Sequence, residues 1–209
     1  MTKLQVRLEA KSRFMKGSKL KKSLILIITV LSLALLVTGC AGQSFTDAEL
    51  GVPEISVTSD SIVQGRLVTD VAADRSPNVP LGGNQSPHVS WEPVDGADYY
   101  AVIMFDESAG WLHFLVTDIT VTEIEQGRYT DTTTYVGPYP PKSSGEHNYR
   151  IEVFAIREQP TDSIAKINSR SSYAGIVNHL NQVGGNSDNI IARGHITGTY
   201  QYGDDTGND

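Results

Sequence analysis

The sequence predicts a mainly β domain, an antiparallel sandwich of two sheets with one helix near its end. Short runs of β-branched and aromatic residues recur along the chain, separated by Gly, Pro, Asn or Asp. Only one later segment has the apolar period of a long helix. The body, residues 53–202, is long enough for one domain with its own core.

The predicted strands differ in how they are buried. Residues 99–105 form a nearly continuous apolar run, so we expect this strand to be buried on both faces. Residues 148–156 alternate between polar and apolar, which is typical of a strand with one face in the core. The other predicted strands are residues 55–58, 88–91, 112–116 and 195–202.

A single helix is predicted close to the C-terminal end. Apolar residues at 173, 176, 177, 180 and 183 follow the i, i+3, i+4, i+7 pattern. Ser171-Ser172 offers N-terminal caps, and Gly184-Gly185 provides a stop. A shorter turn is predicted over residues 187–192, and the acidic residues 203–209 predict a disordered tail.

The first 39 residues have the layout of an export signal peptide. Residues 1–22 carry eight Lys and Arg against the single Glu9, and residues 24–37 are apolar except for two hydroxyl residues. This apolar run is shorter than the roughly 20 residues that a membrane-spanning helix needs. An uncleaved signal anchor is the alternative, and Met15 is an alternative start.

Cys40, the only cysteine of the chain, follows the small pair Thr38-Gly39. This arrangement resembles the lipobox of bacterial lipoproteins, in which the cysteine is acylated, for example with palmitate, and becomes the first mature residue. A lone cysteine cannot form an internal disulfide, which agrees with a role in lipid attachment. We therefore expect a protein anchored at the bacterial cell membrane, with residues 40–52 as its lipidated tether.

The charge of the mature chain excludes one class of partner. Removing residues 1–39 leaves nine Lys and Arg against 23 Asp and Glu, a net charge of −14. Binding to nucleic acid rests on neutralisation of phosphates by basic side chains, so we expect no nucleic-acid partner. The same charge disfavours a domain lying flat on an anionic leaflet.

Residues 135–149 carry the strongest functional signal in the residues themselves. A Gly-Pro-x-Pro-Pro loop leads directly into the strand whose first inward positions are His147 and Tyr149. Prolines fix φ, so the loop holds one shape. The pattern predicts a preformed pocket for a polar ligand.

Several blocks resemble the phosphatidylethanolamine-binding protein family, in its bacterial Raf kinase inhibitor-like branch. The resemblance covers residues 54–202 and rests on residues 83–91, 100–106, 111–114, 135–149, 189–192 and 196–200. It implies a Greek-key sandwich of two antiparallel sheets with a C-terminal helix. It also implies a small pocket at one end for an anionic group such as phosphate or a phospholipid headgroup.

The resemblance implies a set of pocket residues as well. Asp106 matches the first Asp of the family's Asp-Pro-Asp-Ala-Pro motif, but residues 106–110 lack both prolines and the second Asp. We therefore expect a less rigid loop here. The hydrogen bonds of the second carboxylate are expected to be lost or remade by Ser108. Tyr139 is implied to donate to the anion through its backbone amide. The implied ligand-binding set is Asp106, His113, Tyr139, Pro141, His147 and Tyr149.

These groups suit an oxyanion. Histidine N–H, tyrosine O–H and a loop amide are all donors, and Asp106 is expected to hold one imidazole in a fixed tautomer and favour its protonation. Affinity should then fall as the pH rises through the histidine range, around 6.5.

The other chemistries are less well supported by the sequence. Asp106, His113 and His147 could in principle ligate a metal, but the local His spacing of such sites is absent, so no metal or other cofactor is predicted. No Gly-x-Ser-x-Gly elbow or phosphate loop is present, and no enzyme is predicted. The alternative function is a protein-interaction module that inhibits a protease, because an exported lipoprotein does not meet cytosolic kinases. His88, His179 and His195 are expected to be structural or at the surface, and Trp91 and Trp111 are expected to lie in the core.

Overall fold

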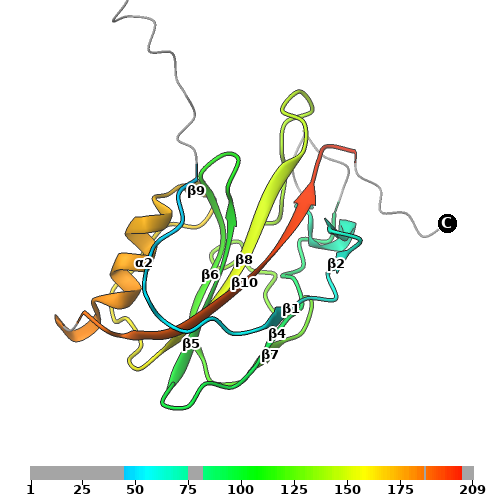
Figure 1. Ribbon diagram of the computed structural model, residues 1–209. Helices are drawn as coiled ribbons and strands as arrows, with labels where there is room; N and C mark the ends of the chain where they lie inside the picture. The colour runs from blue at the N-terminus through cyan, green and yellow to red at the C-terminus, as the bar shows by residue number, and fades with distance from the viewer. Residues whose placement is uncertain (1–44, 75–81, 186, 204–209) are drawn as a thin grey trace, which may run out of the picture. The chain divides into compact units, whose positions relative to one another are not determined.

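The computed structural model describes residues 45–74, 82–185 and 187–203. The predicted signal peptide, Cys40 and most of the predicted tail lie outside the described residues. Two sheets and one α-helix make up the described part (Figure 1), which confirms the predicted mainly β sandwich. None of the described helices is long and apolar enough to cross a membrane.

The two sheets differ greatly in size. The smaller sheet contains, in spatial order, β1 (Val57–Thr58), β4 (Val89–Trp91) and β7 (Glu123–Ile124). The larger sheet contains, in spatial order, β2 (Ile62–Val63), β3 (Arg66–Leu67), β10 (Ile190–Tyr200), β8 (His147–Ile156), β5 (Tyr99–Asp106), β6 (Trp111–Ile119) and β9 (Ser169–Arg170). Strands β10, β8, β5 and β6 are long and antiparallel, and they form the rigid centre of the fold.

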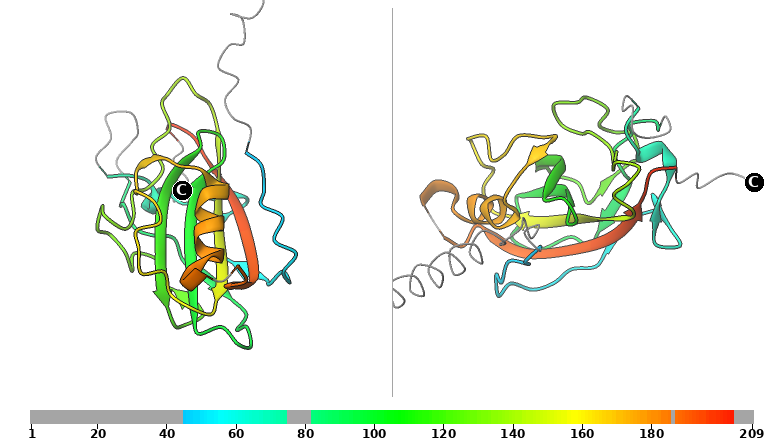
Figure 2. Two further views of the ribbon diagram at one scale, coloured as in Figure 1. Left: turned by 90° about the vertical axis from the view of Figure 1, so that its left-hand side faces the viewer. Right: turned by 90° about the horizontal axis from the view of Figure 1, so that it is seen from above.

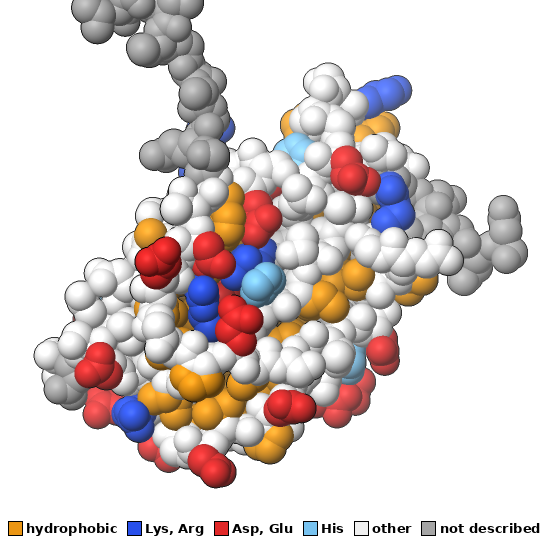
Figure 3. Space-filling view, viewed as in Figure 1, with side chains coloured by type: hydrophobic (Ala, Val, Ile, Leu, Met, Phe, Trp, Pro, Cys, Tyr) orange, Lys and Arg blue, Asp and Glu red, His pale blue; other side chains and the backbone are white. Residues whose placement is uncertain are grey.

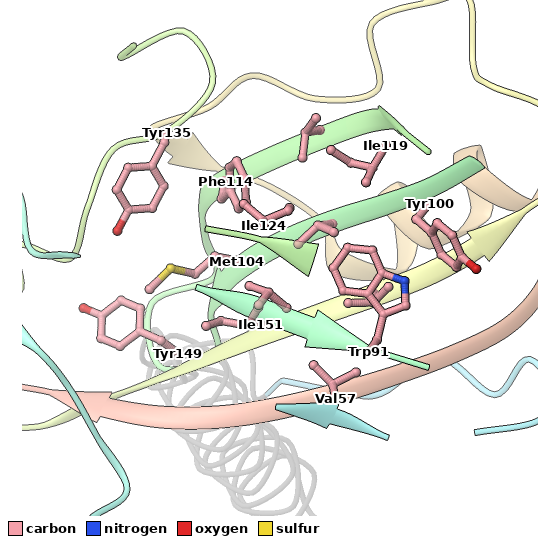
Figure 4. Close-up of a cluster of buried hydrophobic side chains, with 14 of the residues drawn as sticks. Val57, Trp91, Tyr100, Met104, Phe114, Ile119, Ile124, Tyr135, Tyr149 and Ile151 are labelled. Carbon is pink, nitrogen blue, oxygen red and sulfur yellow. The ribbon is translucent and has the colours of Figure 1, made fainter. Parts of the chain in front are cut away.

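Each face of the larger sheet packs on a separate core. On one face, side chains such as Met104, Ile151 and Tyr100 share a core with Trp91 of the smaller sheet, whose ring meets Tyr100 edge-on (Figure 4). On the other face, Phe105 and Phe154 pack beneath helix α2 (Tyr173–Asn181), which lies along the sheet in Figure 2. Because β5 supplies both cores, it is buried along nearly its whole length, as predicted.

Strand β8 is buried more completely than its alternating sequence predicts. Only Asn148 is exposed, and the polar positions Arg150 and Glu152 are buried on the face that α2 covers. They are tolerated there because they pair with each other, with Arg150 Nε lying 2.7 Å from Glu152 Oε2. The alternation therefore separates two buried faces, and the one under α2 combines the Arg150–Glu152 pair with the apolar Phe154 and Ile156.

Helix α2 begins and ends close to its predicted bounds. The Ser172 hydroxyl accepts a hydrogen bond from the Gly175 amide, as expected of an N-cap, and the glycines after the helix have positive φ. The turn predicted over residues 187–192 is wrong, because β10 already starts at Ile190 and pairs there with Ile156. The Asn189 side-chain amide donates to the carbonyls of Leu180 and Glu158, which joins the helix end directly to the sheet.

The larger sheet is not wholly antiparallel, in contrast to the prediction. Strand β3 pairs in parallel with β10 through Arg66 and Thr199. The hairpin β2–β3 sets this direction, and it turns at Gln64-Gly65 with positive φ at both residues. Such turns favour Gly at these positions, so Gly65 indicates a hairpin turn in the sequence. The sequence gives no indication that the hairpin pairs with a strand more than 100 residues away.

Candidate functional site

A cavity of about 260 Å³ opens at the end of the larger sheet where β5 ends and β6 and β8 begin. All six residues of the predicted ligand-binding set line it. The complete lining is Asp106, Ala109, Trp111, His113, Tyr139, Pro140, Pro141, His147, Tyr149 and Arg170. Residues that are more than 30 positions apart in the sequence are thus brought into one pocket.

Strand pairing places the first group of these residues. Asp106 is the last residue of β5 and pairs with Tyr149 of β8. Because side chains alternate along a strand, His147 and Tyr149 share one face, and their rings stack with centroids 6.4 Å apart. Tyr149 continues into the apolar core, so the floor of the pocket is fixed by core packing.

His113 reaches the pocket through a β-bulge. Phe105 pairs with Leu112 and Met104 pairs with Phe114, so His113 is an extra residue in β6 with no partner on β5. A bulge redirects side chains, and here His113 joins the core-facing side with Phe114. The His113 ring meets Tyr149 edge-on, at a centroid distance of 5.4 Å.

Asp106 organises both a histidine and the adjacent turn. Its Oδ2 lies 2.7 Å from His147 Nδ1, and because a carboxylate only accepts, Nδ1 carries the hydrogen. Its Oδ1 accepts hydrogen bonds from the amides of Ser108 and Ala109. The Ser108 hydroxyl in turn accepts from the Asn148 amide, so the divergent loop is tied to β8 at its start.

His113 is held in a different state. Its Nδ1 lies 2.7 Å from the Val136 carbonyl oxygen and donates to it, which leaves Nε2 as the second ring nitrogen. Burial lowers the pKa of His113, and this effect outweighs the nearby carbonyls and Asp106, which favour the charged form. His113 is therefore neutral near pH 7, and its Nε2 is an acceptor.

The Tyr149 hydroxyl is buried and makes no hydrogen bond within the described residues. Burial raises the pKa of this phenol, and the nearby Asp106 carboxylate raises it further, so the group stays neutral. A buried hydroxyl without a partner is costly and needs an explanation. Tyr149 lines the pocket, whereas its hydroxyl oxygen has almost no accessible surface and lies near the Asp106 carboxylate.

The proline loop is anchored from below. The Tyr135 hydroxyl donates to the Val71 carbonyl at 2.5 Å, the Gly137 amide donates to Asn84 Oδ1 at 2.9 Å, and the Ala73 amide donates to the Pro138 carbonyl at 3.0 Å. The Tyr139 hydroxyl donates to Asn168. These contacts hold the loop against the segment around residues 71–73 and fix the position of the pocket wall.

Gly137→Ala is expected to destabilise the protein by about 1–3 kcal/mol or more, as overpacked substitutions do. A Cβ at this position would lie 2.1 Å from the Val71 carbonyl oxygen, and backbone atoms cannot rotate away. Gly175→Ala is the matched control, because its Cβ would meet only the Ser172 side chain at 3.2 Å or more. Equal stability of the two variants in chemical denaturation would contradict this account of the loop.

Two lining residues were missed by the sequence reasoning. Trp111 was expected in the core, but it lines the pocket and its Nε1 donates to Asn168 at 3.0 Å. Arg170 lies on β9, which pairs with Trp111, and no carboxylate in the described part of the chain pairs with it. Arg170 thus adds a guanidinium to the lining that the predicted set of residues does not contain. No local pattern around residue 170 signals the role.

The sequence matches the phosphatidylethanolamine-binding protein family over residues 58–201, well over half of the chain. The chain belongs to this family. The predicted family membership is thereby confirmed, and the matched range includes every lining residue of the pocket.

Solved structures support the same fold. The protein is similar to YbcL of Escherichia coli, described as a new member of the mammalian PEBP family, with a TM-score of 0.53 and 28% identity over 71% of this chain and 98% of that one. It is also similar to CT736 of Chlamydia trachomatis, a putative phosphatidylethanolamine-binding protein homologue, with a TM-score of 0.51 and 20% identity over 71% and 97% of the two chains. The second likeness concerns the fold alone.

Two further features limit the chemistry of this family member. Among the residues that the structure describes, no group of three His, Cys, Asp or Glu side chains is placed to hold a metal ion. The three remaining histidines are not part of the pocket lining, and His88 pairs with Glu123 at 3.1 Å on the smaller sheet. The pocket histidines are thus the ones whose chemistry bears on a ligand.

Acidification is expected to destabilise the protein through His113. The native pKa of His113 lies below the unfolded value of about 6.5. Above about pH 6.5 the residue is neutral in both states, and as the pH falls further the unfolded chain takes up the proton first, so stability is lost until the native pKa is passed. His113→Asn should remove this part of the slope in unfolding free energies measured between about pH 7 and about pH 5. An unchanged slope would contradict the buried neutral state.

Proposed function

We propose that the pocket binds a small oxyanion, such as phosphate or the phosphorylated headgroup of a lipid. The observation that carries the proposal is a set of donors on residues that line one cavity and have no protein partner in the described part of the chain: the Arg170 guanidinium, the Tyr139 amide and His147 Nε2. An oxyanion accepts from all of them at once.

The carboxylate in the lining does not oppose this reading. Asp106 is already engaged by two backbone amides and by His147 Nδ1, so its charge is directed at its own loop and at an imidazole. With Nδ1–H donating to Asp106, Nε2 is the ring nitrogen left for a ligand, and it donates when the ring carries both protons. His113 supplies the complementary acceptor, which suits a ligand that carries one hydroxyl, such as a protonated phosphate.

The cellular setting of the proposal follows from the N-terminal sequence. A basic head, a short apolar segment and Thr38-Gly39-Cys40 support export followed by lipidation of Cys40. The first described residue, Phe45, comes five positions after this cysteine. The domain would then be a surface-bound module that takes up its ligand beside the membrane.

Calorimetric titration of inorganic phosphate tests the proposal. The double substitution His147→Ala and Tyr149→Phe should abolish the heat of binding, whereas His179→Ala, outside the pocket, should leave it unchanged. Equal phosphate affinity in the double variant and the wild type would overturn the proposal. If the protein acts instead by inhibiting a protease through another surface, the double variant keeps that inhibition.

A further inference from the structure

Residues 45–48, which we term the N-terminal clasp, are held on the helix-covered face of the larger sheet. Phe45 packs against Tyr173 with a centroid distance of 4.9 Å and against Phe105 at 6.2 Å. The Arg150 guanidinium lies over the Phe45 ring, 5.5 Å from its centroid. Phe45, inside the predicted tether, is thus held by two aromatic rings and one guanidinium group.

The clasp also completes a buried charge cluster. Asp47 accepts from Arg150 at 3.0 Å and from Arg193 at 2.9 Å, and both guanidinium groups approach the fully buried Glu152. Partial burial would raise the pKa of Asp47, but the two guanidinium groups outweigh it and lower that pKa. Figure 3 shows acidic and basic side chains gathered on this face. Two cations thus hold Asp47 in place.

The clasp lies at the same end of the sheet as the ligand pocket, on the opposite face. Phe105, which Phe45 contacts, immediately precedes the pocket residue Asp106. Arg150, which binds Asp47, directly follows Tyr149 and also contacts Glu107 of the pocket loop at 3.6 Å.

We infer that the clasp holds the pocket end of the domain against the membrane to which the chain is attached. This inference rests on the proposed lipid on Cys40. Phe45 comes five positions after Cys40, and five extended residues span at most about 18 Å. The opposite end of β5 lies about 25 Å further along the strand direction, at roughly 3.3 Å per residue. An anchored clasp therefore keeps the pocket, and not that far end, at headgroup height.

The distribution of charge favours the same orientation. Two basic residues lie at the pocket end, and no described carboxylate pairs with them: Arg170 lines the pocket, and Lys142 directly follows the lining residue Pro141. The mature chain as a whole carries a net charge of −14. An anionic leaflet therefore repels most of the domain and attracts this end, because each surface Lys or Arg contributes about 1 kcal/mol to binding there. The partner of this surface is a lipid bilayer.

The test uses the full lipidated protein in vesicles that contain anionic lipid and a quencher attached to the lipid headgroup. One fluorophore is placed at Ser143 of the exposed loop after Pro141, and another at Val121, beyond the far end of β6. Ser143 should be quenched several-fold more strongly than Val121. The double variant Phe45→Ala, Asp47→Ala should make the two positions equal, and the exposed Glu49→Ala is the matched control.

The outcomes separate the two proposals. A protein that does not float with the vesicles refutes the lipid anchor and the orientation with it. A protein that floats but is quenched equally at both positions, or more at Val121, refutes the orientation alone. Unchanged quenching in the clasp double variant, whose folding is checked by thermal unfolding, shows that the clasp does not set the orientation.

Discussion

Arg150→Leu is expected to lower the free energy of unfolding by about 3–5 kcal/mol, because it leaves a buried carboxylate without its main partner. Glu152 is fully buried and receives the Arg150 Nε at 2.7 Å. After the substitution it keeps only the Tyr173 hydroxyl, at 2.6 Å, and a long contact of 3.6 Å to Arg193. Neither replaces the charge that compensates the carboxylate.

The double variant Arg150→Leu, Glu152→Leu is the matched comparison. Replacing both members of a buried pair with apolar residues removes the uncompensated charge, so most of the lost stability should return. The stability of the single variant should also approach that of the wild type in acid. An uncompensated buried carboxylate has a raised pKa, and the cost of burying its charge disappears once it is protonated. Chemical denaturation of both variants checks this. A double variant less stable than the single one would show that the cluster stabilises by more than mutual compensation.

Asp106→Asn is expected to abolish the pH dependence of oxyanion binding. In the wild type, Asp106 Oδ2 accepts from His147 Nδ1, so Nε2 donates to a ligand only when the ring is charged. In the variant, the amides of Ser108 and Ala109 still require an acceptor at Oδ1, so the new NH₂ group faces His147. It then donates to Nδ1, and the neutral ring carries its hydrogen on Nε2.

Sulfate is the suitable probe for this experiment, because its charge is constant across the range whereas that of a phosphate group changes near pH 6. Between about pH 5.5 and about pH 8, the wild-type affinity for sulfate should fall roughly tenfold. This factor corresponds to the difference in free energy between a charge-assisted hydrogen bond and a neutral one. The variant should show a weaker but constant affinity. A variant that keeps the full pH dependence would mean that His147 does not contact the anion.

Much of the fold was predictable because its elements have strong local signals. The continuous apolar run of β5 predicted burial on both faces, and the capped periodic segment predicted α2. The alternation in β8 placed His147 and Tyr149 on one face, which the strand pairing places beside Asp106. These features depend on residues that are adjacent in the sequence or one helical turn apart.

The features that were missed depend on distant contacts. The family resemblance placed His113 in the pocket, but the bulge that brings it there was not predicted, because it is defined only by the register between β5 and β6. Arg170 lies there because β9 pairs with Trp111, which is 59 positions earlier. The polar segment before residue 53 reads as a tether, yet Phe45 and Asp47 find partners on β8, α2 and β10. Local composition carries no information on such partners.

The central claim is that an oxyanion sits in this pocket, and amide chemical shifts of the isotope-labelled protein during a phosphate titration test it most directly. We predict saturable shifts of the amides of Tyr139, His147 and Tyr149, with smaller changes at the exposed Lys142. Shifts that grow without saturation, or that follow the surface lysines while Tyr139 stays unchanged, would contradict a built anion site.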